Sequence, residues 1–229
     1  MRNKDLRIII YFLTGLSIFL GFFIIKTNSL SISKPRGIIC LVIDDFGYSH
    51  NHTINEFLQM DPDFTLAIIP GHSYSKSISE VAHANGFEII IHMPMEPYNY
   101  DLVSEKEFIL TEKLNPYEVD KRITDAFEQI PMAVGMNNHQ GSKATENLQL
   151  MKSIARSLKK KGLFFLDSFT NPESRGFITM RRFGVKTELR QVFLDHIDDS
   201  LHIINQLDSL VNLSHAMDVA IGIGHVKPI

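Results

Sequence analysis

The sequence predicts an α/β fold, with an irregular seven-stranded (β/α) barrel as the first choice and an open doubly wound sheet as the alternative. Seven short apolar runs alternate with stretches of helical periodicity. The runs are continuously apolar, which is typical of parallel strands buried on both faces. Asp or His side chains follow six of the seven runs, and parallel α/β folds place active sites at the carboxyl ends of their strands.

The predicted strands are these apolar runs, and each has a recognisable end. The first ends in Asp44 and Asp45, and the single cysteine of the chain, Cys40, lies within it and is expected to be buried. The second is closed by Pro70 and Gly71, which favour a turn. In chain order the predicted strands cover residues 37–43, 64–69, 87–91, 132–135, 163–166, 190–194 and 218–223.

The predicted helices begin and end at residues that suit helix termini. Asn115 can cap a helix that has Pro116 at its first position and Glu118 at its third. The following helix has an apolar face and a lysine-rich face, and Gly162 ends it. In chain order the predicted helices cover residues 51–60, 75–84, 116–129, 145–161, 173–182 and 198–213.

Residues 8–25 form an apolar segment without a charge. As a helix this segment would be about 27 Å long, close to the hydrocarbon thickness of a bilayer. We therefore expect a signal anchor or transmembrane helix in residues 1–26, a polar linker in 27–36, and an extracytoplasmic domain in 37–229. A cleaved signal peptide and a buried helix are the alternatives.

The overall composition excludes several classes of function. Hydrophobic residues make up 44% and charged residues 21% of the chain, so a packed core is expected. The net charge is -3 and no basic block is present, which argues against a nucleic-acid partner. The sequence also lacks Gly-rich phosphate loops, Cys pairs and a Gly-x-Ser-x-Gly motif, so nucleotide, zinc-finger and serine-hydrolase interpretations have no support.

Asp44 and Asp45 are the most informative pair in the sequence. Adjacent carboxylates at the end of a buried strand repel each other and lose water, which costs free energy unless a cation neutralises one of them. Since adjacent side chains diverge, one could bind the cation while the other acts as a base. The structural alternative is that one Asp caps the next helix and the other is exposed.

Two histidines and a glutamate follow other predicted strands. His92 ends the third strand, Glu96 lies four residues later, and His139 lies in a small polar loop after the fourth strand. Each could bind a metal, although Pro94 and Pro97 argue against a helix that would place His92 and Glu96 on one face. Taken alone, His92 could equally be a hydrogen-bonded structural histidine.

The remaining candidates lie late in the chain. Asp167 could orient a ligand histidine or balance charge in the catalytic group, or it could cap the following turn with Ser168. His225 suits a proton donor to an amine leaving group. Asp195 and His196 are weaker candidates, because helix capping explains that stretch. The other histidines are interpreted as surface or structural residues: His50, His52, His72, His83, His202 and His215.

One carboxylate, two imidazoles and an open coordination position suit a divalent metal, with zinc as the first choice. With Asp45, His92 and His139 as ligands, Asp44 remains available as a base. Such an arrangement suits hydrolysis of an amide or an ester.

Five ordered motifs resemble those of the divergent polysaccharide deacetylases, which are relatives of the wider sugar deacetylase superfamily. The resemblance covers residues 37–228. It implies an irregular seven-stranded (β/α) barrel and metal-dependent removal of acetyl groups from N-acetylated sugars. The motifs are Ile-Asp-Asp-Phe-Gly, His-Met-Pro-Met-Glu-Pro, Asn-His-Gln-Gly-Ser, Leu-Asp-Ser and Ile-Gly-His.

The resemblance also implies roles for individual residues. By motif position Asp44 would be the base, and His225 would protonate the leaving amine. Asp45 and His92 would be metal ligands. The oxyanion would be held by the metal and by a backbone amide near Gly141 or Tyr98.

The third metal ligand departs from the superfamily pattern. The wider superfamily takes this ligand from a histidine four residues after the second ligand, where this chain has Glu96. We take His139 as the substitute. The C-terminal end departs as well, because related chains continue with another helix and strand beyond the position of Ile229. We therefore expect a truncated barrel whose last strand has an uncovered edge.

The first functional hypothesis is a membrane-anchored, extracytoplasmic and metal-dependent deacetylase of an envelope polysaccharide. The second is a non-catalytic envelope protein that keeps the fold and binds a glycan or a partner. The third is a metal-dependent hydrolase of another acyl or phosphate substrate. Fold does not decide among them, because substrates are recognised by sites and not by folds.

Overall fold

A computed structural model describes residues 37–99 and 105–227, which belong to one compact unit spanning Gly37–Ile229. The predicted anchor in residues 1–26 and the linker in 27–36 lie outside the described residues. In the part of the chain that the structure describes, no helix is both long and apolar enough to cross a bilayer.

The described residues form alternating strands and helices, as the sequence predicts. Asn115 caps α4 with the predicted capping box, and Gly162 ends α5 in a left-handed conformation. The elements are β1 (Ile38–Phe46), α2 (His52–Leu58), β2 (Thr65–Ile68), α3 (Ser75–Ala84), β3 (Glu88–Met95), α4 (Pro116–Gln129), β4 (Gly135–Gln140), the 3-10 helix η2 (Ala144–Glu146), α5 (Leu148–Lys161), β5 (Phe164–Asp167), α6 (Gly176–Phe183), β6 (Thr187–Leu189), β7 (Val192–Phe193), α7 (Ser200–Met217) and β8 (Val219–His225).

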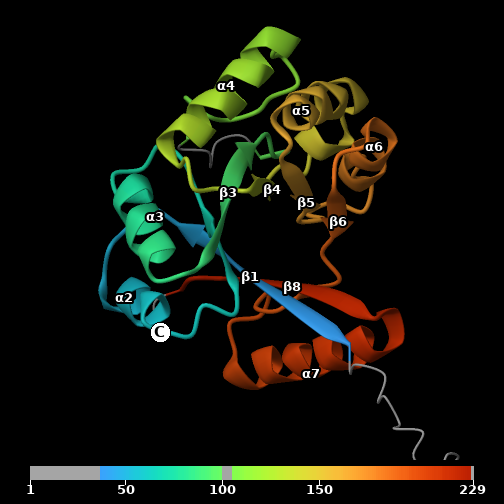
Figure 1. The fold of residues 1–229 in the computed structure, drawn as a ribbon. Coiled ribbons are helices and arrows are strands. Elements are labelled where there is room, and N and C mark those ends of the chain that lie inside the picture. The colour runs from blue at the N-terminus through green and yellow to red at the C-terminus, as the bar shows by residue number, and fades with distance from the viewer. Residues whose placement is uncertain (1–36, 100–104, 228–229) are drawn as a thin grey trace, which may run out of the picture. The chain divides into compact units, whose positions relative to one another are not determined.

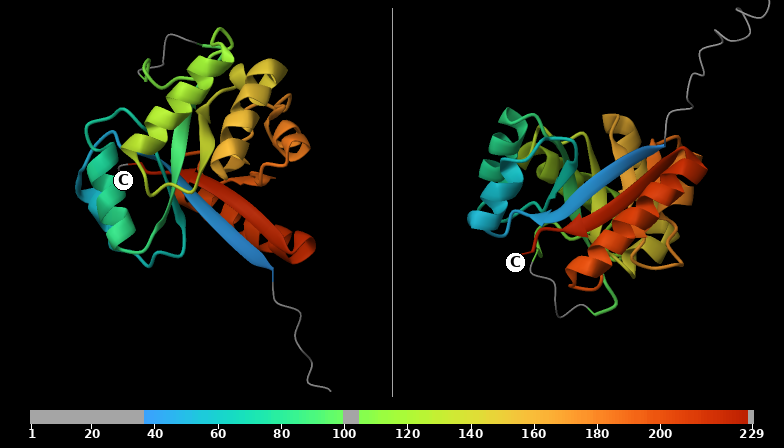
Figure 2. Two further views of the ribbon diagram at one scale, coloured as in Figure 1. Left: turned by 45° about the horizontal axis from the view of Figure 1, so that its top comes forward. Right: turned by 90° about the horizontal axis from the view of Figure 1, so that it is seen from below.

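All the strands join one parallel sheet in the order β6-β5-β4-β3-β2-β1-β8-β7. The sheet is curled, and the helices follow one another around its outside (Figures 1 and 2). Helix α7 packs on β8 and β1, which lie side by side although they are the last and first described strands. The prediction of a parallel α/β sheet with barrel-like curvature is thus confirmed.

Within the described residues the sheet contains eight strands, whereas the sequence predicts seven. The predicted strand at 190–194 corresponds to β7, which pairs with β8 at one edge of the sheet, whereas β6 precedes it, pairs with β5 at the opposite edge and was not predicted. Arg190 and Gln191, which we call the seam, connect the two edges. The amide of Arg190 donates to Asp167 O on one side (3.0 Å), and that of Gln191 donates to Ile221 O on the other (3.0 Å). Backbone continuity therefore joins the edges of the curl.

Several strands extend further toward their carboxyl ends than the apolar runs indicate. The predicted strand at 132–135 is wrong by several residues, because β4 begins at Gly135 and carries His139 on the strand itself. The expectation of an uncovered last strand is also wrong, since β8 lies between β1 and β7. At the amino end of β1, Cys40 is exposed and not buried as expected.

The inside of the curl is built in layers. A large apolar core lies between the sheet and its helices and contains side chains from both. A smaller apolar cluster, with side chains from five strands, lies on the inner face of the sheet. Because side chains alternate along a strand, residues two positions later face the same side. Polar side chains follow three residues of the inner cluster on this face. Asp44 follows Val42, His92 follows Ile90, and His225 follows Ile223.

Candidate active site

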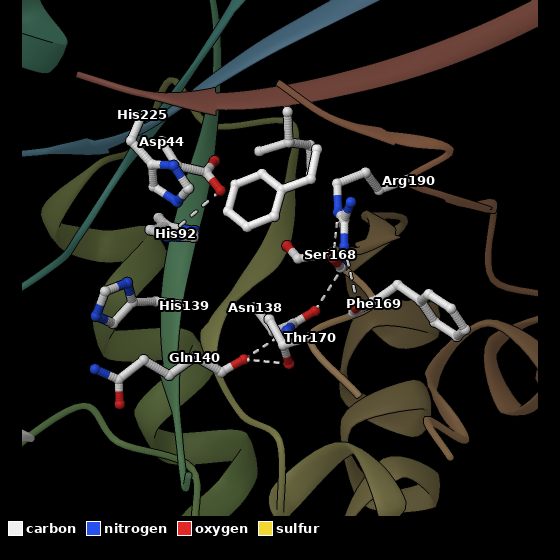
Figure 3. A pocket seen from close by; sticks show the side chains of 12 residues that line it. Asp44, His92, Asn138, His139, Gln140, Ser168, Phe169, Thr170, Arg190 and His225 are labelled. Atoms are coloured by element: carbon white, nitrogen blue, oxygen red, sulfur yellow. Dashed lines mark hydrogen bonds and ion pairs between the residues drawn. The ribbon is translucent and has the colours of Figure 1, made fainter. Parts of the chain in front are cut away.

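A cavity of about 330 Å³ lies at the carboxyl ends of the strands, above the inner apolar cluster. Its position agrees with the general rule for parallel α/β folds. Figure 3 shows two walls. One carries Asp44, His92, His139 and His225, and the other carries Ser168, Phe169 and Arg190.

A β-bulge brings both aspartates of the first strand to the same wall. Between Ile43 and Phe46, β1 has one residue more than its partner β2. Asp45 lies in this bulge with φ = 72°, a left-handed conformation that is uncommon for a residue other than glycine. Strict alternation would turn adjacent side chains apart, whereas here Asp44 Oδ2 and Asp45 Oδ1 lie 3.6 and 3.4 Å from the same nitrogen, His92 Nε2.

Asp45, His92 and His139 form a group that can hold a metal ion. One potential ligand atom from each lies within 4.8 Å of the other two. Asp45 Oδ1 is 3.4 Å from His92 Nε2 and 3.2 Å from His139 Nδ1, yet this buried oxygen accepts no hydrogen bond. In a tetrahedral zinc site with ligand bonds of about 2.0–2.1 Å, neighbouring ligand atoms are about 3.3 Å apart. The spacing and the unpaired oxygen therefore fit a bound divalent ion.

Asn137 connects the second ligand to the predicted base. His92 and Asn137 are paired in register on β3 and β4, and His92 Nδ1 lies 2.7 Å from Asn137 Oδ1. Asn137 Nδ2 in turn donates to Asp44 Oδ1 at 2.8 Å. An amide oxygen only accepts, so the proton of a neutral His92 is on Nδ1 and the lone pair of Nε2 faces the metal group.

The charges in this group shift one another's protonation. Burial raises the pKa of Asp44, although His92 and His225 act in the opposite direction. Burial also favours protonation of Asp45, but His139 and His92 outweigh it and hold its pKa well below the usual range. Burial disfavours the charged form of His92, yet Asp44 and Asp45 outweigh that effect and raise its pKa to about 8.

His225 faces Asp44 from the neighbouring strand and is held by Asp195. Asp44 and His225 are register partners on β1 and β8. His225 Nδ1 lies 2.9 Å from Asp195 Oδ1, and the His225 amide donates to Asp195 Oδ2 at 3.0 Å. Burial disfavours the charged imidazole, but the hydrogen bond with Asp195 and the charges of Asp44, Asp45 and Asp195 together outweigh it and raise the pKa of His225. Asp195, which the sequence ranks as a weak candidate, therefore orients the predicted proton donor.

Two other predicted residues do not join the metal group. Asp167 is buried and accepts hydrogen bonds from the amides of Phe169 and Phe177 and from the hydroxyl of Ser174, at 3.0, 2.9 and 2.7 Å. These contacts correspond to the capping alternative and not to orientation of a ligand histidine. Glu96 pairs with Lys143 at 2.8 Å, away from the metal group.

The two predicted oxyanion donors differ in their surroundings. The amide of Tyr98 already donates to Ser142 Oγ at 3.2 Å. Gly141 has φ = 85°, and a Cβ there would lie 2.8 Å from Cβ of Met95, so a residue with a side chain would be strained at this position. Gln140 lines the cavity, and Gly141 is the next residue in the chain. Of the two predicted oxyanion donors, the amide of Gly141 is therefore the one adjacent in sequence to a cavity residue.

The opposite wall contains residues that the sequence analysis did not identify. Arg190 donates from Nε to Ser168 O (2.7 Å) and from an Nη to Phe169 O (3.0 Å). Its guanidinium carbon lies 4.8 Å from the centre of the Phe193 ring. Like Asp45, Phe169 has a positive φ, of 50°. Asn137 and Arg190 were missed because neither is distinctive until the register of the sheet is known.

Comparison with known proteins identifies the family of the chain. The family model described as divergent polysaccharide deacetylase matches residues 41–229. The uncharacterized protein YibQ of Escherichia coli K12 is 33% identical over 201 residues, which cover 87% of this chain and 62% of the relative. An uncharacterized protein of Haemophilus influenzae is 32% identical over 208 residues, covering 90% of this chain and 73% of the relative. The chain thus spans less than two thirds of the first of these relatives.

A solved structure shares the fold. The crystal structure of an uncharacterized protein from Agrobacterium tumefaciens C58 superposes with a TM-score of 0.76. The match covers 85% of this chain and 80% of the other, with 20% sequence identity. At this identity the likeness concerns the fold alone.

Proposed function

The chain belongs to the divergent polysaccharide deacetylase family, and from this membership we propose that it is a metal-dependent hydrolase that removes acetyl groups from an N-acetylated envelope polysaccharide. The observation that carries the proposal is the convergence of Asp45, His92 and His139 beside Asp44 and His225. A metal group, a buried carboxylate and an oriented imidazole are the parts that amide hydrolysis requires.

Asp45, His92 and His139 would hold the divalent ion. One carboxylate and two imidazoles leave a coordination position open, and this donor set favours zinc. When bound, the ion supplies Lewis acidity. Asn137 keeps the imidazole of His92 in the tautomer that presents its lone pair.

Asp44 and His225 would divide the proton transfers between them. Asp44 is 2% exposed and would accept the proton of the attacking water. His225 would give a proton to the amine nitrogen as its bond to the acetyl carbon breaks. Asp195 stabilises the charged imidazole before this transfer and orients the ring. Because Asp44 and His225 are neighbours across β1 and β8, both groups can reach one bound amide.

The test is acetate release by the zinc-loaded full chain from N-acetylglucosamine oligomers. Asp44→Asn should lower kcat by about 10²- to 10⁴-fold, as expected for the loss of a general base. His83→Ala, at an exposed position of α3, serves as the control and should retain the rate. Full activity of Asp44→Asn would exclude the proposed base.

Two other outcomes would support the alternative functions. Metal binding without acetate release from any N-acetylated sugar would favour the non-catalytic glycan-binding protein. Release of another acyl group or of phosphate, with no action on N-acetyl sugars, would favour a hydrolase of a different substrate class.

We also propose that residues 8–25 anchor the domain to a membrane and place it outside the cytoplasm. The proposal rests on the length and apolarity of this segment. A full chain with a C-terminal reporter should sediment with membranes and be accessible to protease from the extracytoplasmic side. Recovery of the full chain in the soluble cytoplasmic fraction would contradict it.

A further inference from the structure

The wall opposite the metal group contains a positive charge that the proposed reaction does not use. Arg190 lies in the seam between β6 and β7, and its side chain lines the cavity together with Asp44 and His92. Figure 3 shows it across the cavity from the histidines. Both walls line the same cavity, so a ligand that fills it from the metal group would meet Arg190 on the far side.

The guanidinium is held in a fixed orientation. Nε and one Nη donate to the carbonyl oxygens of Ser168 and Phe169, and the ring of Phe193 lies against the guanidinium carbon. These contacts use two of the five N–H donors of the side chain. The remaining donors are fixed in position without a further protein acceptor among residues 37–99 and 105–227.

No carboxylate of the described residues forms an ion pair with Arg190. The charges of Asp44 and Asp167 act on Arg190 from a distance, while Asp44 accepts a hydrogen bond from Asn137 and Asp167 accepts one from Ser174. Burial removes water that the guanidinium would otherwise keep and lowers the pKa of Arg190, and the charges of Asp44 and Asp167 offset this effect only in part. An anion supplied by the ligand would remove this cost.

A second donor lies beside Arg190. Ser168 is 6% exposed and lines the cavity, and its hydroxyl oxygen is buried with no hydrogen-bond partner in the described part of the chain. Buried hydroxyls in native proteins are normally hydrogen-bonded, so this one on a cavity wall is available to a ligand or to a water that the ligand displaces. Together the hydroxyl and the guanidinium form a pair of donors suited to an oxyanion.

We propose that Arg190 is a specificity-determining residue that binds a carboxylate or phosphate substituent of the acetylated sugar, with Ser168 as the second donor. The inference rests on the proposed deacetylase function, and it narrows the substrate to an anionic N-acetylated sugar. Arg190 selects the substrate by charge, whereas Asp44 and His225 act on its amide.

Three sugars with the same ring test this selection. N-acetylglucosamine is neutral, its 6-phosphate carries a phosphate, and its 3-O-lactyl ether carries a carboxylate. In the zinc-loaded full chain, one of the two anionic sugars should have a higher kcat/KM than the neutral one. The sugar with the higher value identifies which anion is bound. Preference for the neutral sugar would overturn the proposal.

Substitution of Arg190 should change the preference and not only the rate. Arg190→Gln should lower the ratio of kcat/KM for the anionic sugar over the neutral sugar by about 10- to 100-fold, as expected for lost charge-assisted hydrogen bonds. Arg181→Gln on the exposed face of α6 is the matched control, and the ratio should stay constant. An equal loss on both sugars in Arg190→Gln would assign Arg190 to holding the Ser168–Phe169 backbone and would overturn the proposal.

Ser168→Ala keeps the contacts of Arg190 with the backbone and provides an independent test. This variant should lower the same ratio several-fold with an unchanged melting temperature. If Arg190→Gln fails to fold, the proposal is tested with Ser168→Ala alone. An unchanged ratio of kcat/KM for the anionic over the neutral sugar in this variant would then contradict the proposal.

Binding measurements separate this inference from the proposed function. Calorimetry on zinc-loaded Asp44→Asn needs no turnover, and the anionic sugar should bind more tightly than the neutral one, with the difference lost when Arg190→Gln is added. Such binding without acetate release in the wild-type chain would refute the deacetylase function and leave the anion site standing. Equal acetate release from all three sugars would support the deacetylase and refute the anion site.

Discussion

Asp45 shows how one backbone conformation organises the site. Its left-handed φ costs about 1–3 kcal/mol in a residue with a side chain, and such strain persists where the surrounding structure enforces it. Here the bulge that contains it brings two adjacent carboxylates to one histidine nitrogen. The division of roles that the sequence predicts for Asp44 and Asp45 therefore has a geometric basis in the extra residue of β1.

The sequence singled out the residues that the structure brings together at the strand ends, but not their supporting partners. Asp44, Asp45, His92, His139 and His225 stand out in sequence because charged or imidazole side chains follow apolar runs. Their hydrogen-bond partners depend on which residues are neighbours across strands, and a single sequence does not contain the register.

The identity of the third ligand can be tested directly. His139→Ala should lower zinc affinity by at least 10- to 100-fold, because His139 Nδ1 is one of three converging ligand atoms. Glu96→Gln should bind zinc as the wild type does, since Glu96 pairs with Lys143 instead. Zinc content after dialysis and competition with a chelator measure both. The reverse pattern would assign the ligand to Glu96.

Metal affinity should depend on pH through His92. Asp44 and Asp45 raise the pKa of His92 to about 8 in the metal-free protein, so the ring is protonated below that pH and cannot bind metal. Zinc affinity should therefore rise by about tenfold per pH unit between pH 6 and 8 and level off above, because one proton is displaced. Calorimetric titrations across this range measure the slope, and a flat profile would contradict the shifted pKa.

At the scale of elements, capping residues predicted the ends of helices better than apolar runs predicted the ends of strands. Helix α4 occupies the predicted residues 116–129, because Asn115, Pro116 and Glu118 form its start. Helix α5 begins later than predicted, since Asn147 caps it after the short 3-10 helix. The strands β1, β3, β4 and β8 continue through polar residues, since ladder hydrogen bonds involve the backbone and do not require apolar side chains.

Asp167 belongs to the element scale, because its contacts hold the segment between β5 and α6. Asp167→Ala would leave the amides of Phe169 and Phe177 without their acceptor. We expect a loss of about 2–4 kcal/mol in the free energy of unfolding, with zinc affinity unchanged. Chemical denaturation and zinc titration measure the two quantities. A fall in zinc affinity with little loss of stability would instead support the role in ligand orientation that the sequence suggested.

At the scale of the whole molecule, metal binding should stabilise the fold. The proposed ligands come from β1, β3 and β4, so an ion that binds only the folded chain would link three strands. At a free zinc concentration of about 100 times Kd, the stabilisation is about 2.7 kcal/mol. For a domain of this size that raises Tm by roughly 5–10 °C.

Thermal unfolding with and without zinc measures this shift. His92→Ala should remove most of the shift, whereas His83→Ala, which lies outside the metal group, should keep it. An equal shift in both variants would show that zinc binds elsewhere on the chain.

The overall architecture was predictable except for its closure. Alternating elements and continuous apolar runs indicated a parallel curled sheet, which the shared fold of the Agrobacterium tumefaciens protein also supports. The short strand β6, Thr187-Glu188-Leu189, is not an apolar run, so apolarity alone could not show that a strand at one edge of the sheet precedes β7 at the other.

The seam is the place where the two edges of the curled sheet are joined by the backbone and not by paired strands. Elsewhere in the sheet, moving two neighbouring strands apart would break the backbone hydrogen bonds between them, which costs free energy. At Arg190 and Gln191 only two residues connect the edges, so a lengthened or shortened connection can alter the width of the opening while the neighbouring ladders keep their register.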